Sequence, residues 1–286
     1  LALPTMPIRE LEQVAASVRH LGAALQAAEA QRRQLSQQVL TLQDDERARL
    51  ARDLHDEFGQ HLTALRVDAA WLARQLADDA QLKPVVEGMA AQCALVQQQI
   101  RSLLTRMQPF GPVADGPEAG ESLARGTDLL KSLVASWHGD ARERGLHCRI
   151  DLACFDAQGE AAGWPGDDLA QALALPRGLW LTLYRISQEA LTNVARHAQA
   201  GTAGLQLHLQ GDLQPGALLR IDWAVWDDGI GLPGGRQVLP RGNGLAGLQE
   251  RVWAQGSELQ CGPWQAGAAR PGLRLGARVE TRLLAP

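Results

Sequence analysis

Apolar residues in the first part of the chain recur at alternating steps of three and four positions. The run extends from Leu11 to Leu42 and forms a heptad seam along one face of a long helix. Because a single helix cannot bury such a stripe, we expect a parallel two-chain coiled coil over residues 1–44. The next seam position is Leu50. This longer step is a stutter, which locally unwinds a supercoil and makes residues 43–49 a candidate hinge.

The seam then continues to Leu76, and a second helical stretch opens at Lys83-Pro84 and ends near Met107. Two long helices joined by a short turn form an antiparallel hairpin, and two hairpins paired through the seam form a four-helix bundle. We assign this hairpin to residues 45–108. The stretch Pro109–Gly120 then breaks the helical pattern and is predicted to be a linker.

Beyond residue 120, helical patterns are mixed with mostly adjacent strand-like runs. We expect helices near 122–144, 177–197 and 245–255, and strands near 146–152, 203–209, 217–226, 258–261 and 274–283. This order indicates an α/β sandwich, a sheet with helices on one face, over residues 121–286. The whole chain is therefore predicted to be an α+β multidomain protein.

The composition excludes several classes of protein. The chain has 286 residues, which suits two domains or one large one, and a formal net charge of −4. Without an excess of cations, direct binding of nucleic acid is not expected. No apolar run is long enough to span a bilayer, and the start does not resemble a signal peptide. The four cysteines lack metal-ligand spacing, so we expect reduced thiols in a cytoplasmic protein.

The first candidate for chemistry is a histidine on the predicted bundle. His55 follows the seam residue Leu54, so it lies about 100° round the helix, on the flank of the bundle. A flank histidine beside carboxylates is usually an ordinary solvated residue. A neutral imidazole is nevertheless a good nucleophile near pH 7, and Asp56 could accept its proton. Asp56 and Gln60 share a helical face and could orient a water molecule.

A second candidate lies on the predicted helix that ends near His197. Glu189, Asn193 and the pair Arg196-His197 line one face of this helix. An acid, an amide oxygen and two potential cations suit a Mg²⁺ ion that bridges polyphosphate oxygens. An amphipathic helix with an ordinary polar face would have the same pattern, so this segment alone does not decide the matter.

Two glycine-rich segments follow, one after a predicted strand and one before a predicted helix. They are Asp227-x-Gly229-x-Gly231 and Gly242-x-Gly244-x-x-Gly247. Neither has strand, glycines and helix within one unit, as a dinucleotide fold requires, and no P-loop motif occurs. We interpret them as two halves of one nucleotide pocket. Asp227 can accept a hydrogen bond from an exocyclic amine, the first glycines let the backbone approach a flat base, and the second set places helix-start amides against phosphates.

Taken in order, these segments resemble the H, N, G1 and G2 boxes of sensor histidine kinases. The matching strings are His55-Asp-x-x-Gly-Gln60, Glu189-x-x-x-Asn193-x-x-Arg-His197, Asp227-x-Gly-x-Gly231 and Gly242-x-Gly-x-x-Gly247. More narrowly, the chain resembles the subfamily of nitrate/nitrite and membrane-fluidity sensors, in which the phosphorylated histidine is followed by an acid and, four residues later, by a glutamine. The resemblance runs from about Gln43 to the C-terminus, and four motifs in order make it specific.

The resemblance implies a dimerisation and histidine-phosphotransfer bundle joined to an ATP-binding domain of the type shared with Hsp90, gyrase B and MutL (the Bergerat or GHKL fold). By position, the implied roles are phosphoacceptor for His55, general base for Asp56, water positioning for Gln60, Mg²⁺ binding for Glu189 and Asn193, phosphate binding for Arg196 and His197, and adenine recognition for Asp227. Residues 232–241 would be a lid over ATP.

The implied activity is autophosphorylation on His55, followed by transfer to an aspartate of a response regulator with a helix-turn-helix output domain. Phosphatase activity toward that regulator is also implied. The protein would act as a homodimer, and residues 8–44 would be the input rod from a sensor domain outside this chain. The chain would then be the cytoplasmic portion of a sensor that is itself in the membrane.

The sequence departs from the family pattern near the last strand. Ala277 stands where the family has a threonine that approaches the nucleotide, and Ala254-Gln-Gly256 has one glycine where two are common. We expect weaker phosphate contacts or an altered lid, with the site retained. The alternatives are an ATPase or serine kinase on the same nucleotide fold, and a coiled-coil scaffold with a degenerate nucleotide domain.

Overall fold

A computed structural model describes residues 8–76, 79, 81–111, 119–140, 146–232 and 243–285. The chain divides into two compact units. One contains residues 1–40, 121–175 and 182–286, and the other contains residues 41–120 and 176–181. The first of these units contains the sheet and is called the sheet unit below. The second is called the hairpin unit.

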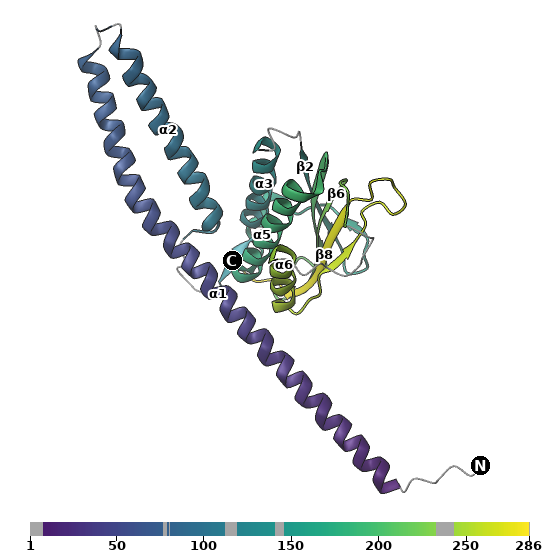
Figure 1. The fold of residues 1–286 in the computed structure, drawn as a ribbon. Coiled ribbons are helices and arrows are strands. Elements are labelled where there is room, and N and C mark those ends of the chain that lie inside the picture. Colours follow the sequence, from purple (N-terminus) through teal and green to yellow (C-terminus); the bar gives the residue numbers. More distant parts are fainter. Residues whose placement is uncertain are drawn as a thin grey trace. The chain divides into compact units, whose positions relative to one another are not determined.

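The hairpin unit is built from the second half of one very long helix, from residue 41 onward, and from the helix that follows it. Helix α1 spans Ile8–Gln75 and α2 spans Leu82–Met107 (Figure 1). The carboxylate of Asp79 accepts the backbone N–H groups of Gln81 and Leu82, both at 2.9 Å, and so satisfies donors that the start of α2 would otherwise leave free. Helical structure is unbroken across residues 43–49, so the stutter affects only the register of the seam. The predicted end of the second helix is confirmed.

Each helix of the hairpin carries an apolar stripe that the described chain does not cover. Ala69 of α1 and Val86 and Leu104 of α2 are buried, which gives the hairpin a thin core of its own. A second set of large apolar side chains remains exposed at heptad-like spacing: Phe58, Leu65 and Leu72 on α1, and Val85, Met89, Val96 and Leu103 on α2. Apolar stripes of this length are normally buried against another surface.

The sheet unit has a six-stranded sheet in the order β3-β2-β5-β6-β8-β7. These strands are β2 (His147–Phe155), β3 (Ala161–Ala162), β5 (Thr202–Gln210), β6 (Leu218–Asp227), β7 (Gln260–Gly262) and β8 (Leu273–Arg282). Strands β2 and β5 are parallel and the other pairs antiparallel. All five predicted strands are present.

Three helices cover one face of this sheet, as predicted: α3 (Leu123–Asp140), α5 (Arg177–Asn193) and α6 (Asn243–Ala254) (Figure 1). The sequence did not predict the short helix α4 (Asp167–Gln171), the edge strand β3, or the two-stranded sheet of β1 (Gly120–Ser122) and β4 (Ala174–Pro176). Of the predicted linker, residues 112–118 lie outside the described part, whereas Pro109 and Phe110 are buried.

The period of two along β6 determines which of its residues face the helices. Ile221, Trp223 and Val225 are buried, and the Trp223 indole N–H donates to the Ser187 hydroxyl of α5 at 2.9 Å. The same period of two places Asp227 on this inner face at the end of the strand, where it is 2% exposed. The fold therefore carries one carboxylate into the layer between sheet and helices.

No helix among the described residues is long and apolar enough to cross a membrane. The four cysteines are unpaired. Burial raises the pKa of Cys148 and of Cys154 to about 11, so both thiols are protonated at neutral pH and unreactive as nucleophiles.

Candidate functional site

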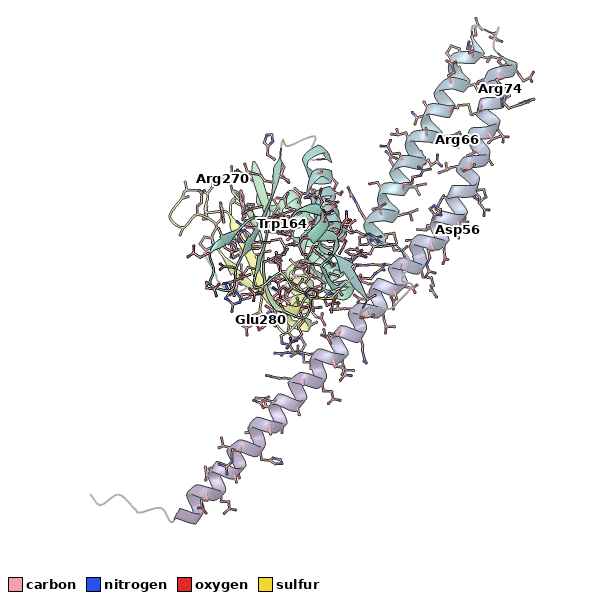
Figure 2. All side chains as sticks on the ribbon, turned by 180° about the vertical axis from the view of Figure 1, so that it is seen from behind. Asp56, Arg66, Arg74, Trp164, Arg270 and Glu280 are labelled. Carbon is pink, nitrogen blue, oxygen red and sulfur yellow. The ribbon has the colours of Figure 1, made fainter. Side chains whose placement is uncertain are left out.

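His55 is held by the residue that follows it. Its Nδ1 lies 3.2 Å from Oδ1 of Asp56, and the two side chains are 68% and 76% exposed. Because a carboxylate accepts hydrogen bonds, this contact favours the tautomer of the neutral ring in which Nδ1 carries the proton and Nε2 the lone pair. The exposed ring can therefore present Nε2 to a substrate as a nucleophile. Figure 2 shows Asp56 projecting from α1.

A groove of about 660 Å³ lies beside this pair, within the hairpin unit. Asp56 and Gln60 both line it, as their spacing on one helical face predicts. The opposite wall comes from α2 and includes Gln97 and Arg101. His55 is about as far from the turn as Arg101 is, which is why an antiparallel hairpin brings them to the same level.

Gln97 and Arg101 were missed by the analysis of sequence motifs. They belong to no recognisable string, and their proximity to His55 follows only from hairpin register. Once the turn is placed near residue 79, that register can be counted from the sequence. Arg101 is a cation whose guanidinium could contact a phosphoryl group in this groove.

The nucleotide half of the predicted site lies in the sheet unit and begins on α5. Glu189 and Asn193 are half-buried there, one helical turn apart. The Asn193 side-chain nitrogen is buried, and no described group forms a hydrogen bond with it. A buried amide without a partner is costly, so this side chain is suited to a ligand that completes its hydrogen bonds or coordinates its oxygen.

The helix does not continue regularly to His197. A π-helical turn, Val194–Ala198, follows Asn193, and Gln199 then ends it with a left-handed φ of 51°. Because a π turn is wider than an α turn, it rotates Arg196 and His197 back from the position that an α-helix would give them. Both side chains are exposed. The common face that the α-helical period predicted therefore holds for Glu189 and Asn193 but is altered for the two cations.

Asp227 ends strand β6 within a set of backbone donors. Its Oδ1 accepts the N–H of Gly229 at 2.8 Å. Burial raises the pKa of Asp227, and the N–H groups of Gly229 and Leu273 and the charge of Arg270 oppose that shift. A buried carboxylate with acceptor capacity remaining is suited to recognise a donor such as an exocyclic amine.

The adjacent Asp228 has a structural role, which the sequence motif did not indicate. Its Oδ1 accepts the N–H groups of Gly201 and Thr202 at 2.8 and 2.9 Å. It thereby fastens the loop after β6 to the start of β5. Side by side in sequence, the two aspartates point to opposite faces of the sheet.

Close backbone packing explains why glycine occupies positions 229 and 231, in the first glycine-rich segment. A Cβ on Gly229 would lie 2.2 Å from the Ala198 carbonyl oxygen, and one on Gly231, with φ +69°, would lie 2.8 Å from the Gly272 carbonyl oxygen. Ile230 N–H also donates to Ala198 at 2.9 Å. These glycines let three backbone segments approach one another, and their approach to a base stays a prediction.

Part of the second glycine segment lies outside the described residues. This applies to Gly242 and to the predicted lid, apart from Leu232. Gly244 lies in the first turn of α6, and a Cβ on Gly247 would meet no atom of the described residues within 4 Å. The open space at Gly247 is compatible with close approach of a ligand to the helix start.

Ala277, which stands in the expected threonine position, is buried on β8 opposite Trp223. It therefore faces the helix-covered side of the sheet, as Asp227 does. An alanine supplies no hydroxyl there, and the weaker phosphate contact stays a prediction.

The donor set fits a weakly held divalent cation. No group of three or more His, Cys, Asp or Glu side chains that could hold a metal occurs among the described residues. Mg²⁺ usually takes one or two protein oxygens together with substrate phosphates and water. The carboxylate of Glu189 and the amide oxygen of Asn193 are oxygen donors of the kind that this requirement calls for.

Comparison with known proteins gives one family match and several relatives. Residues 46–111 match the family model described as histidine kinase (HisKA_3). The chain is 30% identical over 242 residues to the signal transduction histidine-protein kinase/phosphatase UhpB of Salmonella typhimurium, covering 85% of this chain and 41% of that protein. It is 29% identical over 267 residues to the methanol utilization control sensor protein MoxY of Paracoccus denitrificans, with 92% and 53% covered.

The chain is also similar to the nitrate/nitrite sensor protein NarQ of Escherichia coli, at 27% identity over 225 residues, with 78% of this chain and 33% of NarQ covered. Among solved structures, the histidine kinase domain of the Erythrobacter litoralis EL346 blue-light activated histidine kinase matches with a TM-score of 0.38 and 17% identity, over 76% of this chain and 95% of that one. The chain spans between a third and about half the length of these curated relatives.

The family match at residues 46–111, which contains His55, and the relatives that continue through the sheet unit identify the class. Residues 46–111 belong to the HisKA_3 histidine kinases, and the similarity to sensor histidine kinases over most of the chain supports a sensor histidine kinase with an ATPase domain.

Proposed function

We propose that this chain autophosphorylates on His55 with ATP and passes the phosphoryl group to an aspartate of a response regulator. The observation that carries the proposal is the contact between His55 Nδ1 and Asp56 Oδ1 at 3.2 Å, on an exposed surface within the matched family segment. His208 makes a similar contact with Asp151 at 3.1 Å, so the position of His55 inside the matched family segment is what distinguishes it.

The first step is an in-line displacement at the γ-phosphorus of ATP. The lone pair on Nε2 of His55 forms the new N–P bond while the bond to the ADP oxygen breaks. The ring becomes more acidic as the bond forms, and Asp56 takes the proton from Nδ1, so the phosphorylated ring ends neutral.

The sheet unit binds the nucleotide. Asp227 accepts a hydrogen bond from the adenine amino group, and the first turn of α6, with Gly244 and Gly247, lies against the phosphates. Asn193 and Glu189 hold Mg²⁺, which supplies neutralisation of the phosphate charge. Arg196 and His197 extend toward the phosphates from the π turn. The buried Asn193 side-chain nitrogen, which has no described partner, is a donor suited to a phosphate oxygen, and this leaves the amide oxygen for the cation.

The groove beside His55 supports a second activity, hydrolysis of the phosphoryl group on the regulator. Asp56 and Gln60 line the same groove and can orient a water molecule between them. The relative UhpB is described as a histidine-protein kinase/phosphatase. We extend that dual activity to this protein.

The active form is a homodimer, and the second copy covers the exposed apolar stripes. Phe58, Leu65 and Leu72 on α1 are 44%, 53% and 38% exposed. A second hairpin with the same stripes completes a four-helix bundle. Residues of the seam upstream, such as Leu21 and Leu25 at 70% and 60% exposure, pair in the parallel coiled coil.

The remaining partners follow from the family. The response regulator would carry a helix-turn-helix output domain, and the input would come from a sensor domain outside this chain, with this portion in the cytoplasm. Relatives described as nitrate/nitrite and methanol-utilisation sensors support a signalling input.

The test is incubation of the purified chain with γ-labelled ATP and Mg²⁺, beside His55→Gln and Asn193→Ala. We expect acid-labile label on the wild-type chain and none on either variant, because phosphohistidine hydrolyses in acid whereas phosphoserine does not. Label that survives His55→Gln would identify another acceptor, and acid-stable label would favour a serine kinase. ATP hydrolysis without label would favour the ATPase alternative.

A further inference from the structure

The loop that joins β7 to β8, residues 263–272, closes back onto the loop after β6. We call it the β7–β8 loop. Gln265 N–H donates to Pro271 at 2.8 Å and closes the loop on itself, and Gly272 N–H donates to Gly229 at 2.9 Å. Gly272 has φ +61°, and a Cβ there would lie 1.9 Å from the Asp227 carbonyl oxygen. Only a glycine allows this approach, so the end of the loop is fixed against Asp227.

The beginning of the loop is fixed on the opposite face of the sheet. The indole of Trp264 stacks on that of Trp226, with centroids 4.5 Å apart and planes 9° from parallel. Trp226 lies in turn against Gly204, where a Cβ would be only 2.3 Å from the indole. Because Trp226 directly precedes Asp227, this indole stack fixes the C-terminal end of β6 on the outer face of the sheet. Gly272 fixes the same end through its close approach to the Asp227 backbone.

Arg270 connects this loop to the end of the Asn193 helix. Its guanidinium donates to the carbonyl of Gln199, the residue whose left-handed conformation ends the π turn after Asn193. The same positive charge acts on both Asp227 and Asp228. Figure 2 labels Arg270 and Glu280, which lie toward opposite ends of the sheet unit.

We propose that Arg270 is a positioning residue of the nucleotide site, which fixes the Asp227 carboxylate and the end of the Asn193 helix in one arrangement and so sets the affinity for adenine. This inference rests on the proposed function, because it assigns Asp227 to the adenine amino group. Arg270 touches no reacting atom and acts through the two segments that it joins.

Electrostatics give the arrangement a measurable signature. Burial raises the pKa of Asp227, the neighbouring charge of Asp228 raises it further, and the charge of Arg270 lowers it; these two are the charged groups that act on Asp227 in the described chain. Only ionised Asp227 can accept from the amine with both oxygens. Removing the Arg270 charge moves the pH at which adenine binding is lost to a higher value.

The experiment measures affinity for ADP and for inosine diphosphate, which has a carbonyl in place of the amino group, on the whole chain. We expect Arg270→Gln to weaken ADP binding about tenfold, the loss of one charge-assisted contact, with a smaller loss for inosine diphosphate, which uses the Asn193 helix but has no amino group for Asp227. As the pH is lowered from neutral, ADP binding should begin to weaken at a higher pH in Arg270→Gln than in the wild type.

Two further variants separate positioning from stability. Arg270→Lys keeps the charge and should restore the wild-type pH profile with only part of the affinity. Arg282→Gln is the matched control, because Arg282 is exposed, lies on β8 and also donates to a backbone carbonyl, that of Gly216 at 2.9 Å; it should bind ADP as the wild type does.

Several results would overturn the inference. They are wild-type ADP affinity and pH profile in Arg270→Gln, an equal loss for both nucleotides, or an equal loss in Arg282→Gln. If the wild-type chain is labelled on His55 and Arg270→Gln binds ADP normally, the role of Arg270 is refuted and the proposed function is not. Wild-type chain that binds no ADP would refute the proposed function as well.

Discussion

The Nδ1 of His55 lies 3.2 Å from Oδ1 of Asp56, although the two residues are neighbours on one helix. Adjacent helical residues point about 100° apart, so the two side chains meet only by turning toward each other. The contact leaves Nε2 as the ring nitrogen with a lone pair. This hydrogen bond therefore determines which atom of His55 is able to attack.

Loss of the Asp56 carboxylate should slow phosphorylation without unfolding the helix. We expect Asp56→Asn to lower the initial rate of label incorporation about 100-fold, because the amide cannot take the Nδ1 proton. Asp53→Asn, an exposed carboxylate in the same helix, is the control and should keep its rate. Equal rates in the two variants would contradict a proton-accepting role for Asp56.

Gln60 should separate the two proposed activities. It lines the groove beside His55 but has no part in the attack on ATP, so Gln60→Ala should autophosphorylate within about twofold of the wild type. Dephosphorylation of a labelled regulator should fall at least about tenfold, because water is no longer oriented. Gln99→Ala, an exposed amide on α2, should affect neither activity, and a regulator dephosphorylated normally by Gln60→Ala would refute the assignment.

Asp228 should contribute stability that depends on pH. Partial burial raises its pKa, but hydrogen bonds from Thr202 and Gly201 and the charge of Arg270 outweigh this, so the pKa is lowered. A folded pKa below the unfolded value stabilises the fold above about pH 4, and this stabilisation is lost as the pH falls through the folded value.

The measurement is urea unfolding of wild type and Asp228→Ala at several pH values. At neutral pH the variant should lose about 1–3 kcal/mol of unfolding free energy, from two hydrogen bonds to a charged acceptor. The difference should shrink as the pH drops below about 4. Asp128→Ala, whose exposed carboxylate pairs only with Lys131 at 3.2 Å, should lose less than about 0.5 kcal/mol. A difference independent of pH would mean that ionised Asp228 contributes nothing.

The order of helices and strands could be predicted because each long element carries its own period. Leu205 and Leu207 on β5 and Ile221 and Trp223 on β6 alternate cleanly, and these four residues are buried. Helices and strands that are too short to show a period of hydrophobic residues were not predicted. Strand β4 has three residues and α4 has five, and their existence depends on pairing with distant segments.

The candidate site also contains residues that could be placed from the local sequence and residues that could not. Residues within one local string, such as His55 with Asp56 or Glu189 with Asn193, could be placed from helical geometry. The π turn could not, because it comes from a local change in hydrogen bonding that the 3.6-residue period does not contain. Arg101 and Arg270 were missed because only the hairpin register and the closure of the β7–β8 loop bring them to the site.

Two glycines of the nucleotide half should respond oppositely to alanine. At Gly229 the new Cβ would lie 2.2 Å from the Ala198 carbonyl oxygen, so Gly229→Ala should lower the unfolding free energy by about 1–3 kcal/mol. At Gly247 the Cβ would meet no atom of the described residues within 4 Å. Because glycine is a poor helix former, Gly247→Ala should raise the unfolding free energy by about 0.5–1 kcal/mol.

The effect of Gly247→Ala on ADP affinity should be opposite to its effect on the unfolding free energy. Although Gly247→Ala stabilises the domain, it places a methyl group where phosphates approach the start of α6, so ADP affinity should fall about tenfold or more. Calorimetry on the same samples gives both quantities. A stabilised variant that binds ADP as tightly as the wild type would remove Gly247 from the phosphate site.

The continuity of α1 through residues 43–49 makes the input rod testable by insertion. An unbroken helix transmits rotation from its N-terminal part to His55, and the stutter there can absorb a change of register. Seven residues inserted between Leu21 and Leu35 restore the seam and should preserve the rate of His55 labelling. Insertions of three or four residues rotate the seam by about 50° in opposite directions and should change the rate. Circular dichroism confirms that all three insertions remain helical, and equal labelling in all of them would exclude rotation as the signal.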